Sequence, residues 1–197
     1  ASTFKILNSL IAQDEGAVSG PDEVLVWDGH HYDIADWNQN HTLASAYKAS
    51  CVGCYQVIAS RIDPKKYQAH IQRAGYGQLA EPFDPTHFWL DGSLKISALE
   101  QVEFLRKLVN RSLPYKPASY DALRDIMVIE KNDSYTIRAK TGWATSSTLQ
   151  AGWYVGYVET KHGAWLFALN MDISDKSQLP LRQQITEQSL RKMKIIR

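Results

Sequence analysis

Two short stretches of the chain contain residues that could carry out acyl transfer. The first, ASTFK, places Ser2 three residues before Lys5, and residues at that spacing are neighbours on one face of a helix. A serine hydroxyl is a weak nucleophile until a base takes its proton, and a lysine can be that base only when its charge is removed. The N–H groups at a helix start can also stabilise an oxyanion. A helix cap followed by a surface lysine has the same spacing.

The second stretch, AKTGW, follows residues that are typical of a strand, YTIRAK. We expect Lys140 at the end of this strand, with Thr141 and Gly142 beside a cleft. S-x-x-K together with K-T-G is typical of serine enzymes that recognise penicillins. A third stretch, SCV, places Ser50 and Val52 between the other two motifs in chain order. Three motifs in this order are far more specific than a glycine turn after a strand, which would explain K-T-G alone.

Other candidate ligands in the chain are less informative. Cys51 and Cys54 form a C-x-x-C pair, a spacing found in redox pairs and in half of a metal site. No second C-x-x-C, paired histidine motif or thioredoxin-like pattern accompanies them, so we expect two small residues at the start of a helix. The stretch WDGHHYD matches no metal loop, and we expect a solvated turn and no metal there: Asp28, His30, His31 and Asp33.

Patterns before about residue 130 predict the helices that would position the motifs. Apolar residues at helical spacing predict a helix over 3–13, and a second helix follows its cap, Thr42. A third has Asp63 as its cap and ends before Gly75. A fourth begins with the capping box of Ser97 and Glu100. Its apolar stripe is Leu99, Val102, Leu105, Leu108 and Val109.

After about residue 130, three segments rich in aromatic and branched residues predict neighbouring antiparallel strands: YTIRAK, AGWYVGYVE and AWLFALNM. The tail predicts a helix lying across the sheet, with apolar residues at Leu181, Ile185, Leu190 and Met193. The expected fold class is therefore α/β (α+β), a helical lobe beside an antiparallel sheet flanked by helices. We expect one domain over 1–197, with the helical lobe over about 14–130 and the sheet lobe over about 131–197.

Size and charge favour a small-molecule partner. The chain has 197 residues, enough for one domain with a substantial apolar interior. Its 22 lysines and arginines nearly balance 21 acidic residues, so it has no basic surplus that would attract nucleic acid or acidic membranes. No membrane-spanning stretch is visible in the sequence. We therefore expect neither a nucleic acid nor a membrane partner.

On these motifs the chain resembles the class D serine β-lactamases (oxacillinases), and the resemblance covers essentially all of it. ASTFK resembles their nucleophile helix, SCV their S-x-V motif and KTGW their K-T-G motif, while FWLDGSLKIS carries Trp89 of their tryptophan loop. LPLR contains Arg182, and YGQ resembles Y-G-N with Gln78 in place of asparagine. Members of this family have a segment before the nucleophile that adds strands to the sheet. We therefore expect ASTFK to be an internal motif of a longer protein.

The resemblance implies a serine β-lactamase/transpeptidase-like fold and hydrolysis of the β-lactam amide bond through an acyl-enzyme on Ser2. It implies that carbon dioxide N-carboxylates Lys5, with no other cofactor, that this carbamate is the general base, and that Trp89 holds it. Ser50 would relay a proton to the leaving nitrogen, and the N–H groups of Ser2 and Trp143 would form the oxyanion hole. The residues expected around the substrate are Val52, Lys140, Thr141, Gly142, Trp143 and Arg182.

Two other classes share parts of this pattern. Penicillin-sensing domains of bacterial membrane receptors have the same fold and S-x-x-K, but they are acylated without turnover. Cell-wall transpeptidases have S-x-x-K and K-T-G but seldom S-x-V with a tryptophan loop. Hydrolysis is the function we expect, with a β-lactam as the partner, in a periplasmic or secreted protein that is a monomer or a homodimer.

Overall fold

A four-stranded antiparallel sheet forms one part of the protein, in a computed structural model that describes residues 1–146 and 149–197. The strand order is β5-β6-β7-β8. The last three strands are those predicted from sequence. The bounds are β5 Val128–Lys131, β6 Tyr135–Ala144, β7 Gln150–Thr160 and β8 Gly163–Ile173.

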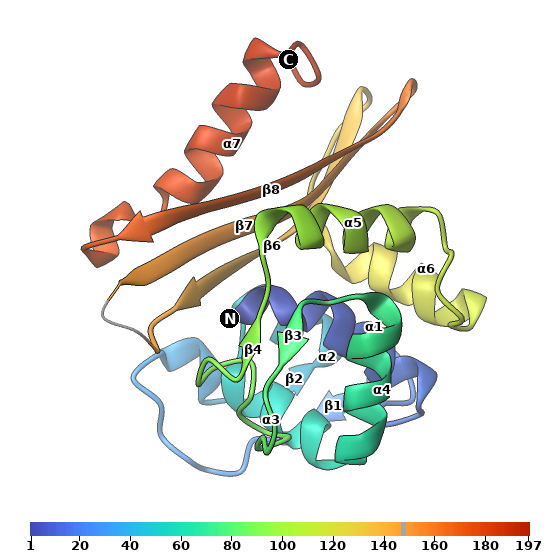
Figure 1. Ribbon diagram of the computed structural model, residues 1–197, viewed down its shortest axis with the longest axis vertical. Coiled ribbons are helices and arrows are strands. Elements are labelled where there is room, and N and C mark those ends of the chain that lie inside the picture. Colours follow the sequence, from blue (N-terminus) through green and yellow to red (C-terminus); the bar gives the residue numbers. More distant parts are fainter. Residues whose placement is uncertain (147–148) are drawn as a thin grey trace.

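Helices cover both faces of this sheet. Helix α7 (Leu181–Lys192) lies on one face, and the other α-helices lie on the opposite side (Figure 1). These are α1 Lys5–Asp14, α2 Leu43–Ala49, α3 Val52–Ser60, α4 Pro64–Ala74, α5 Ala98–Val109 and α6 Pro117–Ile126. Single 3₁₀ turns are η1 Ser2–Phe4, η2 Ala35–Trp37 and η3 Lys176–Gln178. Two small ribbons pair β1 Val24–Leu25 with β2 His41–Thr42, and β3 Gln78–Leu79 with β4 Leu94–Lys95.

The helix ends follow the predicted signals. Thr42 caps α2 in a capping box with Ser45, and Asp63 caps α4 by accepting a hydrogen bond from a backbone N–H. Gly75 ends α4 in the left-handed conformation. Ser97 and Glu100 form the predicted capping box of α5. The mixed helix and sheet fold class is confirmed.

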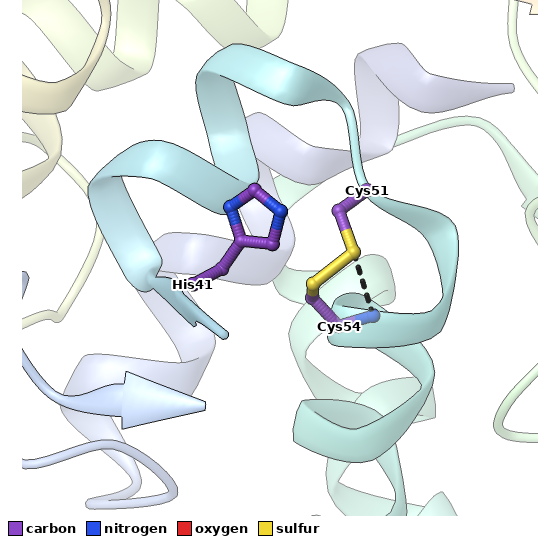
Figure 2. Close-up of side chains that lie close together, drawn as sticks. All are labelled: His41, Cys51 and Cys54. Carbon is purple, nitrogen blue, oxygen red and sulfur yellow. Dashed lines mark hydrogen bonds between the residues drawn. A yellow bond between two sulfur atoms is a disulfide. The ribbon is translucent and has the colours of Figure 1, made fainter. Parts of the chain in front are cut away.

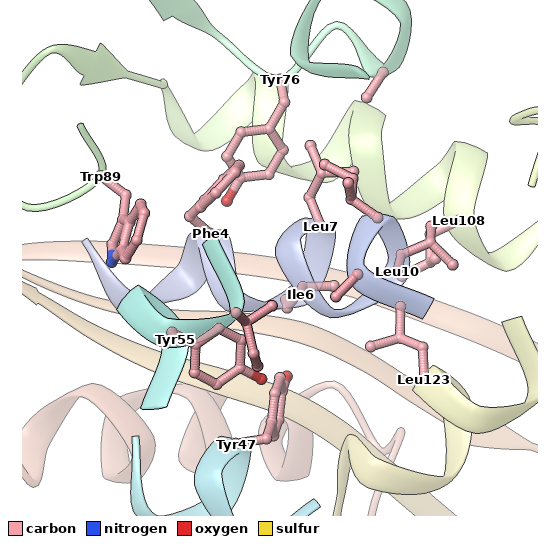
Figure 3. Packing of buried hydrophobic residues seen from close by; sticks show 14 of the residues in the cluster. Phe4, Ile6, Leu7, Leu10, Tyr47, Tyr55, Tyr76, Trp89, Leu108 and Leu123 are labelled. Carbon is pink, nitrogen blue, oxygen red and sulfur yellow. The ribbon is translucent and has the colours of Figure 1, made fainter. Parts of the chain in front are cut away.

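Helix α1 lies at the centre of the larger core (Figure 3). Every residue from Lys5 to Ala12 is buried, so the apolar spacing of this segment does not mark a single buried face. Phe4 packs against Tyr76, Phe88 and Trp89 with ring centroids 5.6, 5.0 and 5.9 Å apart. The start of α1 is therefore fixed by packing on all sides, and this fixes the direction of the Ser2 and Lys5 side chains.

Two predicted apolar stripes are only partly buried. Leu99 is 83% exposed, whereas Phe104, Leu105 and Leu108 of the same helix are buried. In the last helix Leu190 is buried against the sheet, but three other predicted members are exposed: Leu181, Ile185 and Met193. Apolar spacing predicted where the helices lie but not which apolar residue each neighbour covers. None of the helices in the described ranges has the length and apolar character needed to span a bilayer.

Candidate active site

Ser2 and Lys5 meet where the 3₁₀ turn η1 continues into α1. The Nζ of Lys5 lies 3.0 Å from the Oγ of Ser2, within hydrogen-bonding distance. Ser2 is half-buried, whereas Lys5 is fully buried. The S-x-x-K spacing therefore places a partly accessible hydroxyl directly against a buried amine.

The environment of Lys5 disfavours its charged form. Burial, with Lys140 nearby, holds the pKa of Lys5 well below its usual value of 10.5. Lys5 forms no ion pair with any residue in the described ranges, and its Nζ lies 5.0 Å from the ring centre of Tyr55. A buried amine without a counterion is stabilised by losing its proton, and a neutral amine can act as a base.

Lys140 approaches the site from the sheet. Strand β6 continues beyond it as far as Ala144, because Lys140 pairs with Val155 and the pairing does not stop there. The expectation that Lys140 ends its strand was therefore wrong, and K-T-G lies within β6. Burial, with a contribution from Arg182, lowers the pKa of Lys140 to about 7. Its Nζ donates a 3.0 Å hydrogen bond to the carbonyl oxygen of Thr141.

Gly142 lets the nucleophile turn lie directly on the strand. A Cβ at this position would be 3.0 Å from Cγ2 of Thr3 and 3.2 Å from its backbone N, and 3.4 Å from the Cβ of Ala1. A side chain here would force the neighbouring turn to shift by a few tenths of an ångström, so glycine suits this close approach. Gly142 therefore makes room for the residues on either side of Ser2.

Ser50 stands at the corner between α2 and α3, in the left-handed conformation with φ 56° and ψ 30°. Val52 is the first residue of α3. A serine rarely adopts a positive φ, so the surrounding structure must hold it there. The S-x-V motif thus spans the sharp turn between the two helices, and its middle residue, Cys51, is part of the larger core.

Trp89 is buried and stacks on Phe4 with a ring angle of 26°. Its Nε1–H has no hydrogen-bond partner within the part of the chain that the structure describes. A buried donor without an acceptor is costly, so this N–H is available to a group that is not part of the polypeptide.

Arg182 contacts the K-T-G segment of β6, and Trp143 directly follows that segment in the same strand. The Nη1 of Arg182 donates a 2.6 Å hydrogen bond to the carbonyl oxygen of Gly142, and its Nε donates to that of Leu179. Arg182 lies in the first turn of α7. The Nε1 of Trp143 donates to Oε1 of Gln150 at 2.9 Å. Arg182 therefore brings a positive charge to the end of β6 that carries Gly142.

Sequence patterns did not reveal two tyrosines under the lysine amines. The rings of Tyr55 and Tyr47 lie 5.0 and 5.6 Å from the Nζ atoms of Lys5 and Lys140. Burial raises the pKa of both phenols, so they stay neutral. Helical spacing could have indicated both residues, since Tyr55 follows Val52 by three positions and Tyr47 precedes Ser50 by three.

Cys51 and Cys54 form a disulfide, with Cys51 as the N-cap of α3. The expected helix start is confirmed. The interpretation of the cysteines as merely two small residues was wrong, because the sequence alone does not show that their side chains meet. His41 lies beside the sulfurs (Figure 2), with the ligand atoms of all three residues within 4.8 Å. Cysteine binds metal ions as a thiolate, and the sulfur atoms of a disulfide are not thiolates. The candidates of the WDGHHYD stretch are exposed, as predicted: Asp28, His30, His31 and Asp33.

The whole chain is similar to proteins of one family. Residues 1–191 match the family described as penicillin binding protein transpeptidase domain. The chain is 43% identical to beta-lactamase OXA-48 of Klebsiella pneumoniae over 100% of its own length and 74% of the relative's. It is 35% identical to OXA-10 of Pseudomonas aeruginosa, over 94% of this chain and 71% of that protein. It spans a smaller share, 62%, of OXA-2 of Escherichia coli.

A solved structure of a class D beta-lactamase is also similar to this chain. FUS-1 (OXA-85), a class D beta-lactamase from Fusobacterium nucleatum subsp. polymorphum, superposes with a TM-score of 0.96 and 36% identity, covering 100% of this chain and 82% of that one. The fold and the family match define a protein of the penicillin-binding transpeptidase class. Within it, the chain belongs to the class D β-lactamases, hydrolases that act on β-lactams.

The close contact at Gly142 generates a prediction. Gly142→Ala should push the turn that carries Ser2 away from β6, because the added Cβ meets the backbone of Thr3. We expect kcat/KM for a chromogenic cephalosporin to fall about 100-fold, as small displacements of reacting groups do. Overpacking should also lower the free energy of unfolding by about 1–3 kcal/mol.

The matched control is Gly20→Ala, where an added Cβ would meet no atom within 4 Å. Gly20→Ala should change neither kcat/KM nor the free energy of unfolding. Wild-type kcat/KM in Gly142→Ala would show that this glycine does not set the position of the nucleophile.

Proposed function

We propose that this protein hydrolyses the amide bond of β-lactams through an acyl-enzyme on Ser2, with Lys5 as the general base. One observation carries the proposal: the Nζ of Lys5 lies 3.0 Å from the Oγ of Ser2, while burial and Lys140 lower the pKa of Lys5. A neutral amine at this distance can accept the hydroxyl proton, whereas an ammonium group cannot. Membership of the class D family supports the same reaction.

In the proposed acylation, the Oγ of Ser2 attacks the lactam carbonyl carbon while the Lys5 side chain takes its proton. The N–H groups of Ser2 and Trp143 stabilise the oxyanion. Ser50 transfers its proton to the lactam nitrogen as the carbon–nitrogen bond breaks, and it takes in return the proton that the Lys5 side chain received from Ser2, so that Lys5 is again a free base. A water molecule, activated by the Lys5 side chain, then attacks the ester and releases Ser2.

The surroundings of Lys5 also fit a carbamate, with carbon dioxide as the only added group. An amine reacts with carbon dioxide only when it is neutral, and the lowered pKa of Lys5 favours that form. The unpaired Nε1–H of Trp89 can donate to a carbamate oxygen, and its buried ring stacks on that of Phe4, the residue next to Lys5 in the chain, which provides apolar surface there. Val52 is proposed to add to this apolar surface. When bound, the carbamate supplies an anionic proton acceptor.

Substrate carboxylate binding is proposed for Lys140, Thr141 and Arg182. Lys140 and Arg182 are close enough for Arg182 to lower the pKa of Lys140. A bound carboxylate would offset that repulsion and keep Lys140 protonated, since an opposite charge raises the pKa of a lysine. Charged hydrogen bonds of this kind are worth about 1.5–3 kcal/mol each.

The location and assembly remain proposals. We infer a periplasmic or secreted protein, because disulfides such as Cys51–Cys54 form and persist in oxidising compartments. The monomer and homodimer are both compatible with the function, since every proposed catalytic and binding residue comes from one chain.

The nucleophile assignment predicts a covalent adduct. After a short pulse of a penicillin, intact-protein mass spectrometry should detect one acyl group on the wild type and none on Ser2→Ala. The control Ser134→Ala changes an exposed serine in the turn before β6 and should keep the adduct. An adduct that survives in Ser2→Ala would remove Ser2 from the mechanism.

The indole N–H of Trp89 predicts a second result. In ¹³C-bicarbonate the wild type should show the NMR signal of a lysine carbamate, and Trp89→Phe should weaken it because only the donor is lost. We expect deacylation in Trp89→Phe to fall more than acylation, so that the acyl-enzyme accumulates. The control Trp165→Phe changes an exposed indole on β8 and should leave both rates unchanged.

Two outcomes of this experiment would contradict the proposal. A carbamate signal and turnover unchanged in Trp89→Phe would exclude Trp89 as the carbamate donor. Acylation without any turnover in the wild type would favour a penicillin-sensing receptor, which uses acylation as a signal.

A further inference from the structure

The corner that carries Ser50 is unusually tight. Helix α2 ends at Ala49 and α3 begins at Val52, so only Ser50 and Cys51 make the turn. Backbone hydrogen bonds join the Ser50 N–H to the Tyr47 carbonyl and the Cys51 N–H to the Ala46 carbonyl, at 3.2 and 3.0 Å. Because serine disfavours the left-handed conformation, Ser50 keeps it only while the corner is held.

The disulfide closes over this corner from the side of α3. Cys51, 1% exposed, directly follows Ser50, and its Sγ accepts a 3.1 Å hydrogen bond from the N–H of Cys54. The covalent bond therefore fixes the residue next to Ser50 to the first turn of α3, and Val52 lies inside the same small ring. A hydrogen bond to a cysteine sulfur is weak by comparison.

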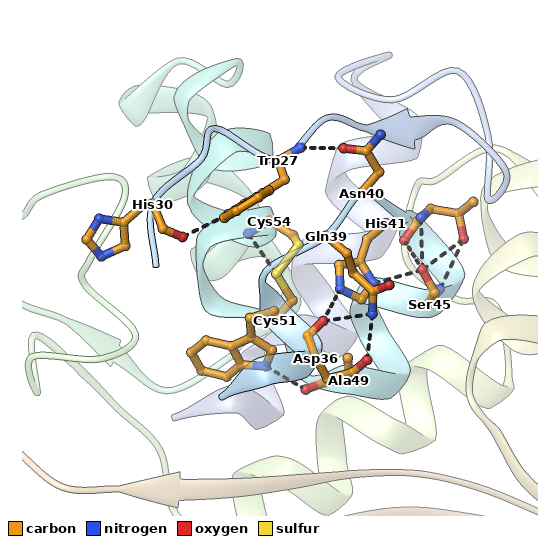
Figure 4. Close-up of a disulfide and its surroundings, with 12 residues drawn as sticks. Trp27, His30, Asp36, Gln39, Asn40, His41, Ser45, Ala49, Cys51 and Cys54 are labelled. Carbon is orange, nitrogen blue, oxygen red and sulfur yellow. Dashed lines mark hydrogen bonds between the residues drawn. A yellow bond between two sulfur atoms is a disulfide. The ribbon is translucent and has the colours of Figure 1, made fainter. Parts of the chain in front are cut away.

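The remaining supports of the corner come from the segment before α2 (Figure 4). The Nε1 of Trp37 donates a 3.0 Å hydrogen bond to the carbonyl oxygen of Ala49. Tyr32 lies so close to Gly53 that any side chain there would collide with its hydroxyl. Most of residues 26–40 are exposed, so this segment is a less rigid support than a covalent bond.

We propose that the Cys51–Cys54 disulfide is a positioning element for Ser50, and that its reduction lowers the rate of acylation. This inference rests on the proposed function, because it assigns the disulfide an effect on the proton relay of that site. A dithiol reductant supplies two electrons and two protons. The sulfur–sulfur bond breaks, two thiols form on Cys51 and Cys54, and the reductant becomes a cyclic disulfide.

The position of Cys51 and Cys54 at the start of α3 favours their reduced, dithiol form once a dithiol reductant is present. Cys51 is the N-cap of α3, where the N–H groups at the helix start stabilise a thiolate. His41 lies beside both sulfurs. Stabilising the reduced form makes a disulfide easier to reduce.

The first arm of the test needs no β-lactam. Amide hydrogen exchange at Ser50, Cys51 and Val52 should become at least about tenfold faster after reduction, because the corner opens locally. Exchange in α4, which has no part in the corner, should stay unchanged. Unchanged exchange at the corner would overturn the proposal whether or not the protein hydrolyses β-lactams.

The second arm measures acylation by a fluorescent penicillin under single-turnover conditions. Reduction of the wild type should slow acylation at least about tenfold with little change in substrate affinity, as misplacement of a proton-transfer group does. In Ser50→Ala the same reduction should have no further effect, because the relay is already lost. A merely structural role of the disulfide would slow both proteins alike and would contradict the proposal.

A cysteine-free control separates the disulfide from other effects of the reductant. Cys51→Ala/Cys54→Ala should acylate as slowly as reduced wild type and should not respond to the dithiol. If oxidised wild type is not acylated at all, the proposed function fails, and the exchange arm still decides whether the disulfide holds the Ser50 corner.

Discussion

The structure depends on one unfavourable interaction, the burial of the Lys5 amine without a counterion. Removing an ammonium group from water is costly, and the nearby Lys140 increases that cost, so the amine is driven toward its neutral form. Placed 3.0 Å from the Ser2 hydroxyl, a neutral amine is a base, and it also reacts with carbon dioxide. The nucleophile, the base and the proposed carbamate all follow from this one buried group.

The rest of the fold maintains that burial. Helix α1 is enclosed by the larger core, and Gly142 allows β6 to lie against the turn that carries Ser2. Strand β6 carries Lys140, whose charge acts on Lys5, and the corner between α2 and α3 carries Ser50, the proposed proton relay. The proposed site therefore draws on three elements that are far apart in the chain.

Much of this arrangement was predictable because short-range rules determine it. Capping residues such as Ser97 predicted the helix ends, strand composition predicted β6 to β8, and three short motifs indicated the proposed catalytic residues. Long-range contacts were not predictable. Leu99 fits an apolar stripe but is left 83% exposed. K-T-G lies within a strand that pairs further than its composition suggests, and Cys51 and Cys54 are joined by a disulfide. Each depends on residues brought together only by folding.

The most direct test is the titration of Lys5 itself. With ¹³Cε-labelled lysine in buffer free of carbon dioxide, NMR should show one resonance, absent in Lys5→Met, that titrates well below 10.5, because burial and Lys140 lower that pKa. The kcat/KM of the wild type should decrease as the pH falls through the pKa of Lys5, because protonation of the amine removes the base. A Lys5 amine that stays protonated up to its usual pKa of about 10.5 would contradict this account.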